Sequence, residues 1–424
     1  MEQILSKSLF KNFSRTMLRS LEKEKVHIAV LGRRNVGKSK LINSIFVKEL
    51  CTVDDKPGTT LESVRSAVEL SPFGPVIIID TAGIDSEDGS RAKKINKTIK
   101  TISTADFAVL VLDAREELDR SETDLITNLR KVKVPFIVAV NKIEFGINPN
   151  LLTELQALEI KHFEISCKEN AGIDNLKKKL IHLLPVESEN KFIKEIVNQD
   201  DIVVLVVPDD FTLSQNSVLK SQVETIHKAI SGSAVCMVVK KHGLSHTISQ
   251  LKNPPDLVIA EDEFIDQVEN ELPPKVNLTT YSLILAKSKA NLADFVTALQ
   301  RIGELNNGDK LLISEACDTH HLRYQDGKLR ITELLNHQTK KNLKVDFSNG
   351  SGLPDNISDY KLIIHCNGCL LSKKEMQSRL RQAALMDIPV VNYSVFVSYM
   401  NGQLPRLISP FNSTASTLPY LNRY

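Results

Sequence analysis

The sequence predicts an α/β protein of several domains, and two observations support this fold class. Short apolar, β-branched runs alternate with longer helical patterns along most of the 424 residues. Strands that alternate with helices pair into parallel sheets covered by crossover helices, and near-continuous apolar strands fit a sheet covered on both faces. At about 100–200 residues per domain, the length allows two to four domains.

Residues 25–185 show the alternation most clearly and form the first expected domain. Its expected strands are Val26–Leu31, Pro75–Asp80, Phe107–Asp113, Phe136–Asn141 and Phe163–Ser166. The polar stretch at 185–191 is typical of a linker.

Two further α/β domains are expected at 192–274 and 276–424. The second domain has expected strands at Ile202–Val207, Ala234–Val239 and Leu257–Ala260, and an expected helix at Val218–Ile230. The third has expected strands at Tyr281–Leu285, Leu311–Ser314 and Leu362–Ile364, and an expected helix at Lys373–Met386. Proline pairs at 254–255 and 273–274 separate these segments.

The composition excludes several classes of protein. Apolar residues make up 42% and charged residues 25%, which excludes a disordered or fibrous chain. No apolar run reaches the roughly 18–20 residues of a membrane-spanning helix, so we expect no membrane partner. With 54 basic and 52 acidic residues, the formal net charge is +2, which argues against nucleic-acid binding by bulk electrostatics. Six cysteines are too few for a disulfide scaffold.

Residues 1–24 form a separate N-terminal extension. The segment is serine-rich, has an apolar face, and lacks acidic residues between its two ends. Its basic residues recur at a spacing of four: Lys7, Lys11, Arg15 and Arg19. This composition is typical of a mitochondrial-type transit peptide, and a solvated helical extension is the alternative interpretation.

The first expected strand leads directly into a phosphate-binding loop, GRRNVGKS, which a helical segment follows. Gly32 and Gly37 let backbone N–H groups curl around phosphate oxygens at a helix N-terminus. Lys38 is expected to reach the β and γ phosphates, and the Ser39 hydroxyl to ligate Mg²⁺.

Four later elements, each at the carboxyl end of an expected strand or in a switch-type segment, indicate GTP rather than ATP. The expected residues of the nucleotide site in these elements are Thr59, Thr60, Asp80, Gly83, Asn141, Lys142, Glu144, Ser166 and Cys167. Thr59, Thr60 and Gly83 are expected to sense the γ-phosphate, and Asp80 to hold Mg²⁺. The remaining five are expected to form the guanine pocket. Such residues at the carboxyl ends of successive parallel strands converge on one edge of the sheet.

Two positions depart from the usual pattern of such enzymes. Glu144 occupies the position where an aspartate normally accepts hydrogen bonds from guanine. Glutamate carries the same charge on a longer side chain. Ile84 stands where some enzymes carry a glutamine that orients water, so hydrolysis needs another group. Asn35 resembles the asparagine that holds K⁺ near the phosphates, and K⁺ neutralises transition-state charge. We therefore expect a slow GTPase that K⁺ stimulates, with Lys38, Asn35, Thr60 and Gly83 as the catalytic set, and equal rates in Na⁺ and K⁺ would contradict this.

The third domain contains two cysteine-bearing segments, each after an expected strand. Cys317 is followed by His320, and His365 precedes Cys366 and Cys369 in a Cys-x-x-Cys. Three cysteines with nearby histidines suit a 4Fe–4S cluster with one non-cysteine iron position, or a structural zinc site. A redox Cys-x-x-Cys is a third interpretation. Buried, inert cysteines are expected at Cys51 and Cys236 instead.

Taken together, these motifs resemble the maturation GTPases of FeFe-hydrogenase, the HydF family, with a TrmE-Era-EngA-like GTPase domain. The resemblance spans residues 26 to 411. It depends on the phosphate loop, the PGTT segment at 57–60, the His365-Cys-x-x-Cys segment, and the downstream stretch from Lys374 to Tyr393.

The resemblance implies a GTPase domain, a dimerisation domain and an iron–sulfur cluster-binding domain. It implies GTP, Mg²⁺, K⁺, a 4Fe–4S cluster and a transient di-iron precursor as cofactors or cargo. It implies Cys317, Cys366 and Cys369 as cluster ligands, with His320 or His365 as the fourth. The implied partners are apo FeFe-hydrogenase, radical-SAM maturases of the HydE and HydG type, and a second copy of the chain. A hydrogenosome or mitochondrion-like organelle is the implied location, with the cytoplasm as the alternative.

A second class of protein shares the same nucleotide-binding domain. An RNA-associated GTPase of tRNA modification or ribosome assembly, with a zinc-stabilised C-terminal module, is the alternative function. It requires a basic RNA-binding appendage, and the last third of the chain is not enriched in Lys and Arg.

Overall fold

The computed structural model divides into two compact units, residues 1–186 and 187–424. It describes residues 26–45, 51–52, 64–80, 91–184, 196–209, 225, 233–316, 331–350, 352–368 and 371–411. The N-terminal extension at 1–24 and the expected linker at 185–191 lie outside these ranges. Within them, no helix combines the length and the apolar character that crossing a bilayer requires.

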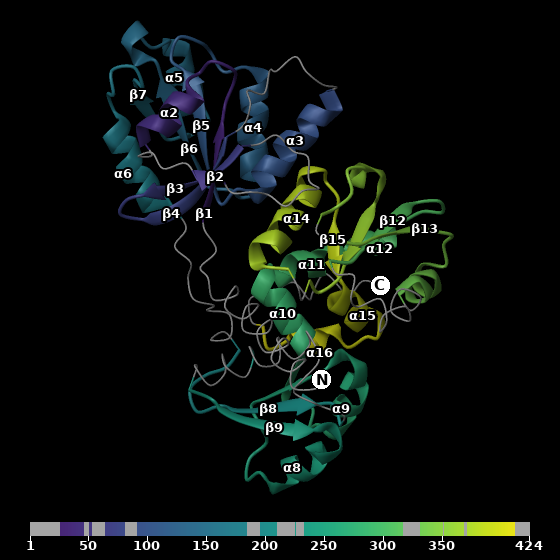
Figure 1. Ribbon diagram of the computed structural model, residues 1–424. Coiled ribbons are helices and arrows are strands. Elements are labelled where there is room, and N and C mark those ends of the chain that lie inside the picture. The colour runs from purple at the N-terminus through teal and green to yellow at the C-terminus, as the bar shows by residue number, and fades with distance from the viewer. Residues whose placement is uncertain are drawn as a thin grey trace, which may run out of the picture. The chain divides into compact units, whose positions relative to one another are not determined.

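The first unit is built on a seven-stranded sheet with the order β2-β3-β4-β1-β5-β6-β7 (Figure 1). Its strands are β1 (Val26–Leu31), β2 (Cys51–Thr52), β3 (Val64–Leu70), β4 (Gly74–Asp80), β5 (Phe107–Asp113), β6 (Phe136–Asn141) and β7 (His162–Ile165). The five neighbouring strands β4, β1, β5, β6 and β7 run parallel, which confirms the expected fold class. Antiparallel β2 and β3 were not expected, because Arg65, Ser66 and Glu69 interrupt the apolar pattern of β3.

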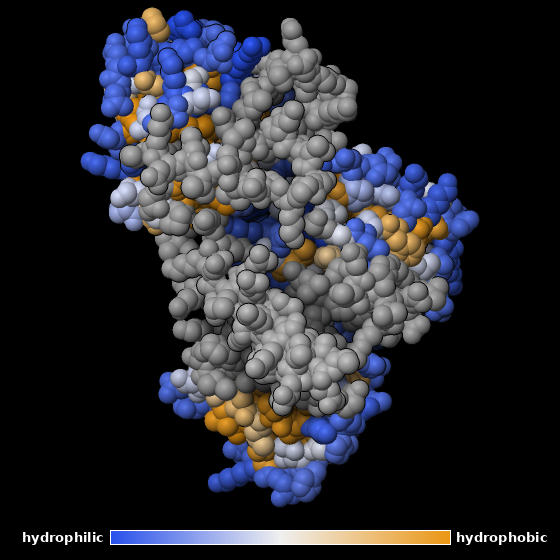
Figure 2. All heavy atoms as spheres, in the orientation of Figure 1, coloured by the Kyte–Doolittle hydropathy of each residue, from blue (hydrophilic) through white to orange (hydrophobic). Residues whose placement is uncertain are grey.

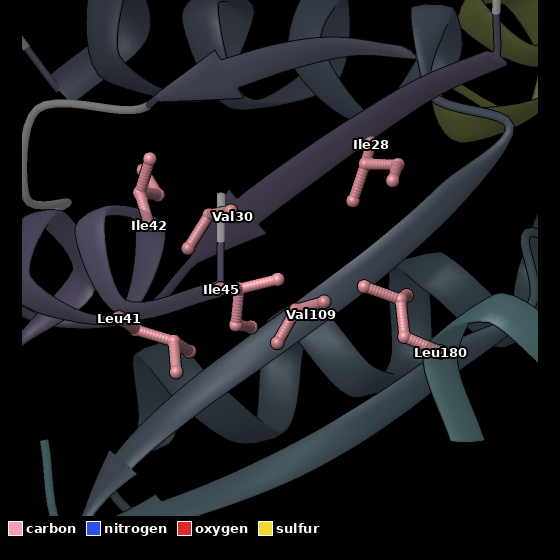
Figure 3. A pocket seen from close by; sticks show the side chains of 7 residues that line it. All are labelled: Ile28, Val30, Leu41, Ile42, Ile45, Val109 and Leu180. Carbon is pink, nitrogen blue, oxygen red and sulfur yellow. The ribbon is translucent and has the colours of Figure 1, made fainter. Parts of the chain in front are cut away.

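Helix packing fixes the start of the phosphate loop in this unit. All seven residues of β5 are buried, as in a strand covered on both faces. The helices are α2 (Lys38–Ile45), α3 (Arg91–Thr104), α4 (Arg120–Lys131), α5 (Pro149–Ala157) and α6 (Ile173–Leu183). Side chains of α2 and α6 meet those of β1 and β5 around an entirely apolar cavity of about 10 Å³ (Figure 3). This contact anchors α2, and with it the loop between β1 and α2.

The second unit contains two four-stranded sheets in which all strands are parallel. The first has the order β11-β10-β8-β9, with β8 (Ile202–Val207), β9 (Val235–Lys240), β10 (Leu257–Ala260) and β11 (Asn277–Thr280). The second has the order β13-β12-β14-β15, with β12 (Lys310–Ser314), β13 (Lys344–Ser348), β14 (Leu362–His365) and β15 (Val390–Asn392). The fold class of a nucleotide-binding domain followed by two α/β regions is thus confirmed.

One continuous hydrophobic core joins the two sheets of the second unit. Its helices are α8 (Leu244–Gln250), α9 (Ile265–Glu271), α10 (Tyr281–Lys289), α11 (Leu292–Ala298), α12 (Gln300–Glu304), α14 (Lys373–Leu385), α15 (Tyr393–Met400) and α16 (Leu404–Ile408). Helix α16 packs against β11. Glu269 on α9 accepts a hydrogen bond from Gln403 (2.7 Å) and pairs with Arg406 (3.1 Å). These contacts make the two regions one body.

The expected strand at Tyr281–Leu285 is wrong. These residues begin helix α10, and the strand is β11, immediately before them. Thr280 explains the switch, because its hydroxyl accepts a hydrogen bond from the Leu283 backbone N–H (3.2 Å) and caps the helix. A short apolar run alone does not distinguish a buried strand from a buried helix.

The other differences are smaller. Strand β13 was not expected because its residues are mostly exposed and polar, and β15 because it has only three residues. Strands β7 and β9 are each displaced by one residue from the expected ranges, as is usual for element ends. The expected helix at Val218–Ile230 lies outside the described residues except for Thr225, which is helical.

Candidate functional site

The phosphate loop between β1 and α2 excludes side chains at two positions. At Gly32 the φ angle is +140°, and a Cβ atom would lie 2.3 Å from the Val111 carbonyl oxygen. At Gly37 the φ angle is +102°, and a Cβ atom would lie 2.2 Å from Nδ2 of Asn141. Between them, Asn35 adopts a left-handed φ of 64°, which asparagine tolerates better than most residues. These residues therefore allow the tight backbone turn in which N–H groups can surround a phosphate group.

Lys38 is the first residue of α2, and its side chain is buried over the loop. Its Nζ donates hydrogen bonds to the carbonyl oxygens of Gly32 (3.0 Å) and Arg33 (2.6 Å). Ser39, the next residue, is exposed. The ammonium and the N-terminal N–H groups of the helix place positive charge at the loop, which suits a phosphate group.

Arg33 ties the phosphate loop to the N-terminus of α4. Its guanidinium lies 2.8 Å from Glu122 and 2.8 Å from Glu116. Glu122 is fully buried, and with Asp119 it forms the capping box of α4. Burial raises the pKa of Glu122, and the hydrogen bond from Arg33 opposes this shift. The contact of Arg33 with these acidic residues was not predicted from the sequence. Its only signal there was the acidic run after β5.

Asn141, at the end of β6, joins the phosphate loop to the loop after β7. Its Nδ2 donates to the Val36 carbonyl oxygen (2.8 Å), and its Oδ1 accepts from the Cys167 backbone N–H (3.0 Å). The side chain is 2% exposed, so these bonds form away from water. One buried amide therefore fixes the position of both loops.

Asp113, at the end of β5, holds the lysine that follows Asn141. Its Oδ2 lies 2.6 Å from Lys142 Nζ and 2.8 Å from Arg115 Nη2. Although burial opposes it, hydrogen bonds from Arg115 and Lys142 hold the pKa of Asp113 well below its usual range. This carboxylate is a residue of the site that sequence reasoning missed. Its signal was an acidic residue at the carboxyl end of a buried strand.

Glu144 and Ser166 supply polar groups at the expected base pocket. A hydrogen bond from the Ser166 hydroxyl, with Lys168 and Lys142 nearby, lowers the pKa of Glu144. The Oε2 atom of Glu144 is buried and has no hydrogen-bond partner in the part of the chain that the structure describes. An ionised carboxylate with an available acceptor suits the N1 and N2 donors of guanine. Burial, together with the charge of Glu144, raises the pKa of Cys167 to about 11, so this thiol stays protonated.

The structure brings together only part of the expected nucleotide site. Gly32, Asn35, Gly37, Lys38 and Ser39 lie on one loop, which the amide of Asn141 links to Ser166-Cys167. Thr59, Thr60 and Gly83 lie outside the described residues. Of Asp80 only the backbone is described, at the end of β4 opposite Val30.

In the second unit, β12 and β14 bring the two cysteine-bearing segments to one sheet edge. The strands are parallel neighbours, with Ser314 opposite His365. The Cys366 backbone N–H donates to the Ser314 carbonyl oxygen (2.9 Å), and its Sγ accepts from the Ala316 backbone N–H (3.3 Å). Cys317 directly follows Ala316 in the sequence. The strand ends therefore converge as their parallel arrangement requires.

The turn after Cys366 is held from two directions. Gly368 has a φ of +60°, and a Cβ atom there would lie 2.5 Å from the Met376 side chain. Lys289, at the end of α10, is buried and donates to the carbonyl oxygens of Gly368 and Leu371. The backbone at Gly368 and the carbonyl oxygen of Leu371 are thus held in place on either side of residues 369–370.

His365 is buried with one ring nitrogen unpartnered. Its Nδ1 lies 2.6 Å from the Cys366 carbonyl oxygen, and because a carbonyl only accepts, Nδ1 carries the proton. Burial, reinforced by Arg379, lowers the pKa of His365 to about 3. The ring is therefore neutral, with its lone pair on Nε2, and Nε2 has no hydrogen-bond partner among the described residues.

The remaining members of the cysteine set are not described. Cys317, His320 and Cys369 lie outside the described residues. Within the described ranges, no three His, Cys, Asp or Glu side chains gather as a metal site. Cys236 lies on β9 in the other sheet of this unit, and burial raises the pKa of its thiol. Of Cys51 only the backbone is described, in β2.

Three family models match the chain in succession. A 50S ribosome-binding GTPase model matches residues 27–142. A hydrogen maturase F dimerization domain matches residues 192–290, and a hydrogen maturase F tetramerization domain matches residues 293–410. The two hydrogen maturase models together match about half of the chain.

Curated relatives match the chain over shorter stretches. GTPase Der of Geotalea daltonii is 33% identical over 162 residues, which is 37% of this chain and 36% of the relative. The tRNA modification GTPase MnmE of Finegoldia magna is 28% identical over 211 residues, which is 49% of this chain and 43% of the relative. The chain therefore spans less than half the length of these two relatives.

Two solved structures are similar to part of this chain. The G domain of the FeoB iron transporter of T. maritima shares 22% identity at a TM-score of 0.29, covering 38% of this chain and 98% of that one. A variant of Era from Aquifex aeolicus bound to GDP.AlF4- shares 18% identity at a TM-score of 0.32, covering 51% of this chain and 93% of that one.

The clash at Gly37 gives a direct test of the loop geometry. Gly37→Ala should weaken GDP binding at least about tenfold, because its methyl group would displace the Asn141 amide and with it the bond to Val36. Gly74→Ala is the matched control, since Gly74 has a similar φ of +111° with nothing within 4 Å. Titration calorimetry with GDP measures both variants. No loss of affinity in Gly37→Ala, or an equal loss in both variants, would contradict this role of the contact with Asn141.

Proposed function

The chain belongs to the hydrogen maturase F family, and from this premise we propose that it is a GTP-hydrolysing carrier that assembles and delivers the di-iron subcluster of FeFe-hydrogenase. One observation supports this most: a GTPase domain and a cysteine-bearing sheet edge lie in one chain whose second half matches hydrogen maturase models. The alternative of an RNA-associated GTPase is supported by the 50S ribosome-binding GTPase model at 27–142 and by matches of up to 49% of the chain to Der and MnmE.

In the proposed GTPase site, this chain's residues hold the nucleotide from both ends. Lys38 and Ser39 would hold the phosphates and Mg²⁺, together with Asp80 and the threonines Thr59 and Thr60. Lys142, Glu144, Ser166 and Cys167 would surround the guanine, with Asn141 bracing both loops. Because Asp113 and Arg33 anchor these segments before the nucleotide binds, little reorganisation is needed at the moment of reaction.

Hydrolysis in this proposal depends on K⁺ held by Asn35. No glutamine follows the Asp80-Thr-Ala-Gly segment. Asn35 is an exposed residue of the phosphate loop and has a left-handed backbone conformation. An amide oxygen at this point gives K⁺ a ligand beside the phosphates, where a cation stabilises transition-state charge.

We expect GTP turnover at least about tenfold faster in KCl than in NaCl, and Asn35→Ala should lower this ratio to about one. The control is Asn170→Ala, because Asn170 is another exposed asparagine with a left-handed φ (56°) outside the phosphate loop. Phosphate release at saturating GTP in each salt measures the effect. A wild-type ratio near one would remove K⁺ from the proposal.

The proposed cluster site is formed by Cys317, Cys366 and Cys369, with His320 or His365 as the fourth ligand. The described part fits this set. The strand ends place Cys366 next to the segment that leads to Cys317, and His365 keeps a buried, unpartnered Nε2. A bound 4Fe–4S cluster would supply an iron position with an exchangeable, non-cysteine ligand for the di-iron unit. This chain's residues hold the thiols, fix the turn and limit access of water.

Cys366→Ser should reduce the iron bound after anaerobic reconstitution to background and leave GTP turnover within about twofold of the parent, because the two sites lie in separate units. Cys236→Ser, a cysteine in the same unit on β9, is the control and should retain full iron. Iron and acid-labile sulfide assays with EPR spectra measure the result. Zinc in place of iron in the parent protein would favour the alternative of a zinc-stabilised module.

The proposed homodimer would form through the edge strand β9. β9 is an edge of its sheet, and Val235 and Val238 on it are about half exposed. Figure 2 shows an apolar patch over the β8–β9 region. An exposed apolar edge strand offers backbone groups and side chains for pairing with a second copy. This strand lies within the dimerization-domain match. Apo-hydrogenase and the radical-SAM maturases remain proposed partners on family grounds.

Val238→Lys should raise the dimer dissociation constant by roughly thirtyfold, about 2 kcal/mol, because a charge would enter the proposed interface. Leu183→Lys, an equally non-conservative change at a partly exposed leucine of the first unit, should leave it unchanged. Sedimentation equilibrium measures both variants. An unaltered dimer in Val238→Lys would move the interface elsewhere.

A further inference from the structure

Arg379 on α14 is a buried cation that the proposed function does not use. Its side chain is 3% exposed. Nη2 donates to the carbonyl oxygens of Gly352 (2.9 Å) and Gly350 (3.1 Å), and to the Ser314 hydroxyl (3.4 Å). Nε and Nη1 are buried and have no hydrogen-bond partner in the described ranges. Two donor nitrogens of this guanidinium are therefore without an acceptor there.

Arg379 lies beside Cys366. Ser314 connects the two residues, because its hydroxyl accepts from Arg379 and its carbonyl oxygen accepts from the Cys366 backbone N–H (2.9 Å). Burial lowers the pKa of Arg379, and the Cys366 side chain is the first of two groups that oppose the shift. The other is Glu375, an exposed residue whose carboxylate accepts from the Ser372 backbone N–H.

A buried guanidinium with unsatisfied donors is costly unless an anion completes it. Burial of a charge is tolerated when the charge is paired, and each unmade hydrogen bond of a buried donor adds a penalty. No described carboxylate forms an ion pair with Arg379. In the proposed function, the anionic group close to Arg379 is the Cys366 thiolate together with the cluster that it would hold.

A second buried cation, Lys289, reaches the same turn from α10. It donates to Gly368 and Leu371, on either side of Cys369 in the sequence. Burial lowers the pKa of the neutral His365 ring, and both cations lower it further. Arg379 and Lys289 are therefore two buried cations close to the segment that holds Cys366.

We infer that Arg379 is a positioning residue for an anionic thiolate–cluster group. Its unpartnered nitrogens donate hydrogen bonds to the sulfur atoms, and its charge stabilises the electron that reduction adds. Hydrogen bonds to sulfur and net charge set the reduction potential of such clusters. The inference rests on the proposed cluster-binding function and adds to it a residue outside the cysteine and histidine set.

The test compares Arg379→Gln, Arg379→Lys and Arg301→Gln in the full chain, reconstituted anaerobically with iron and sulfide. Gln keeps an amide donor for the Gly350 and Gly352 carbonyls but removes the charge, and Lys keeps the charge. Arg301 is exposed and pairs with Glu304, so it controls for loss of an arginine. EPR-monitored redox titration gives the midpoint potential, and an iron assay gives cluster occupancy.

At the parent's midpoint potential, the ratio of oxidised to reduced cluster should rise about tenfold in Arg379→Gln, which equals about 59 mV for one electron. Arg379→Lys should recover most of this shift, and Arg301→Gln should show none. A fully occupied Arg379→Gln cluster with the parent's potential would overturn the inference while leaving the proposed function standing. A parent chain without any iron cluster would overturn both.

A measurement on the unaltered sequence covers the case in which Arg379→Gln does not fold. In the reduced cluster of chain labelled with ¹⁵N-arginine, pulsed EPR should detect a ¹⁵N coupling, because the guanidinium nitrogens bond to the sulfur atoms. The coupling should persist in Arg301→Gln. Its absence from the parent protein would contradict the inference without reference to any Arg379 variant.

Discussion

Both functional regions depend on one constraint: neighbouring parallel strands release their chain at the same edge of a sheet. In the first unit this brings Asn141 to Val36, 105 residues earlier in the chain. In the second unit it brings Cys366 to Ala316, 50 residues earlier. Neither contact arises from local structure. The contact of Asn141 depends on the register of β1, β5 and β6, and the contact of Cys366 depends on the register of β12 and β14. A shift of register would separate the groups that each site needs.

Both regions combine buried polar groups that are hydrogen-bonded with a few that have no described partner. In the nucleotide site, Asn141 uses both ends of its amide, Asp113 holds two cations, and Arg33 pairs with the buried Glu122. Such a network is rigid before any ligand arrives, and it orients donors toward phosphate and base. Near Cys366, His365 and Arg379 keep buried nitrogen atoms without described partners, as Oε2 of Glu144 does in the nucleotide site. Each such group needs a physical explanation, and a bound ion or a redox role is one of those that proteins use.

The sequence predicted much of the nucleotide site because its chemistry is tied to short segments. The curl at Gly32 and Gly37 follows from a loop between a strand and a helix, and Asn141 follows from its place at the end of β6. The site roles of Asp113 and Glu122 could not be assigned, because Lys142 and Arg33, with which they pair, come from distant segments and no sequence spacing indicates these pairs. A role for Arg379 was also not predicted, because an arginine in a helix cannot be distinguished from a surface arginine in the sequence. Only its burial in the structure distinguishes it.

The fold shows the same limit. Buried strands such as β5 are unmistakable as continuous apolar runs. The apolar residues after Thr280 are equally consistent with a strand and a helix, and only the capping bond to Leu283 decides between them. The end of β11 and the start of α10 therefore depend on one hydroxyl group rather than on hydrophobicity.

We propose that an iron–sulfur cluster with three cysteine ligands lies at the β12–β14 edge of this GTPase. Mössbauer spectroscopy of the full chain, loaded anaerobically with ⁵⁷Fe, tests it most directly. We expect a cluster of four irons in which three sites share one isomer shift and one quadrupole splitting, whereas the fourth site, with its non-cysteine ligand, has different values. A spectrum of adventitious iron alone, from protein that retains one zinc per chain, would contradict it.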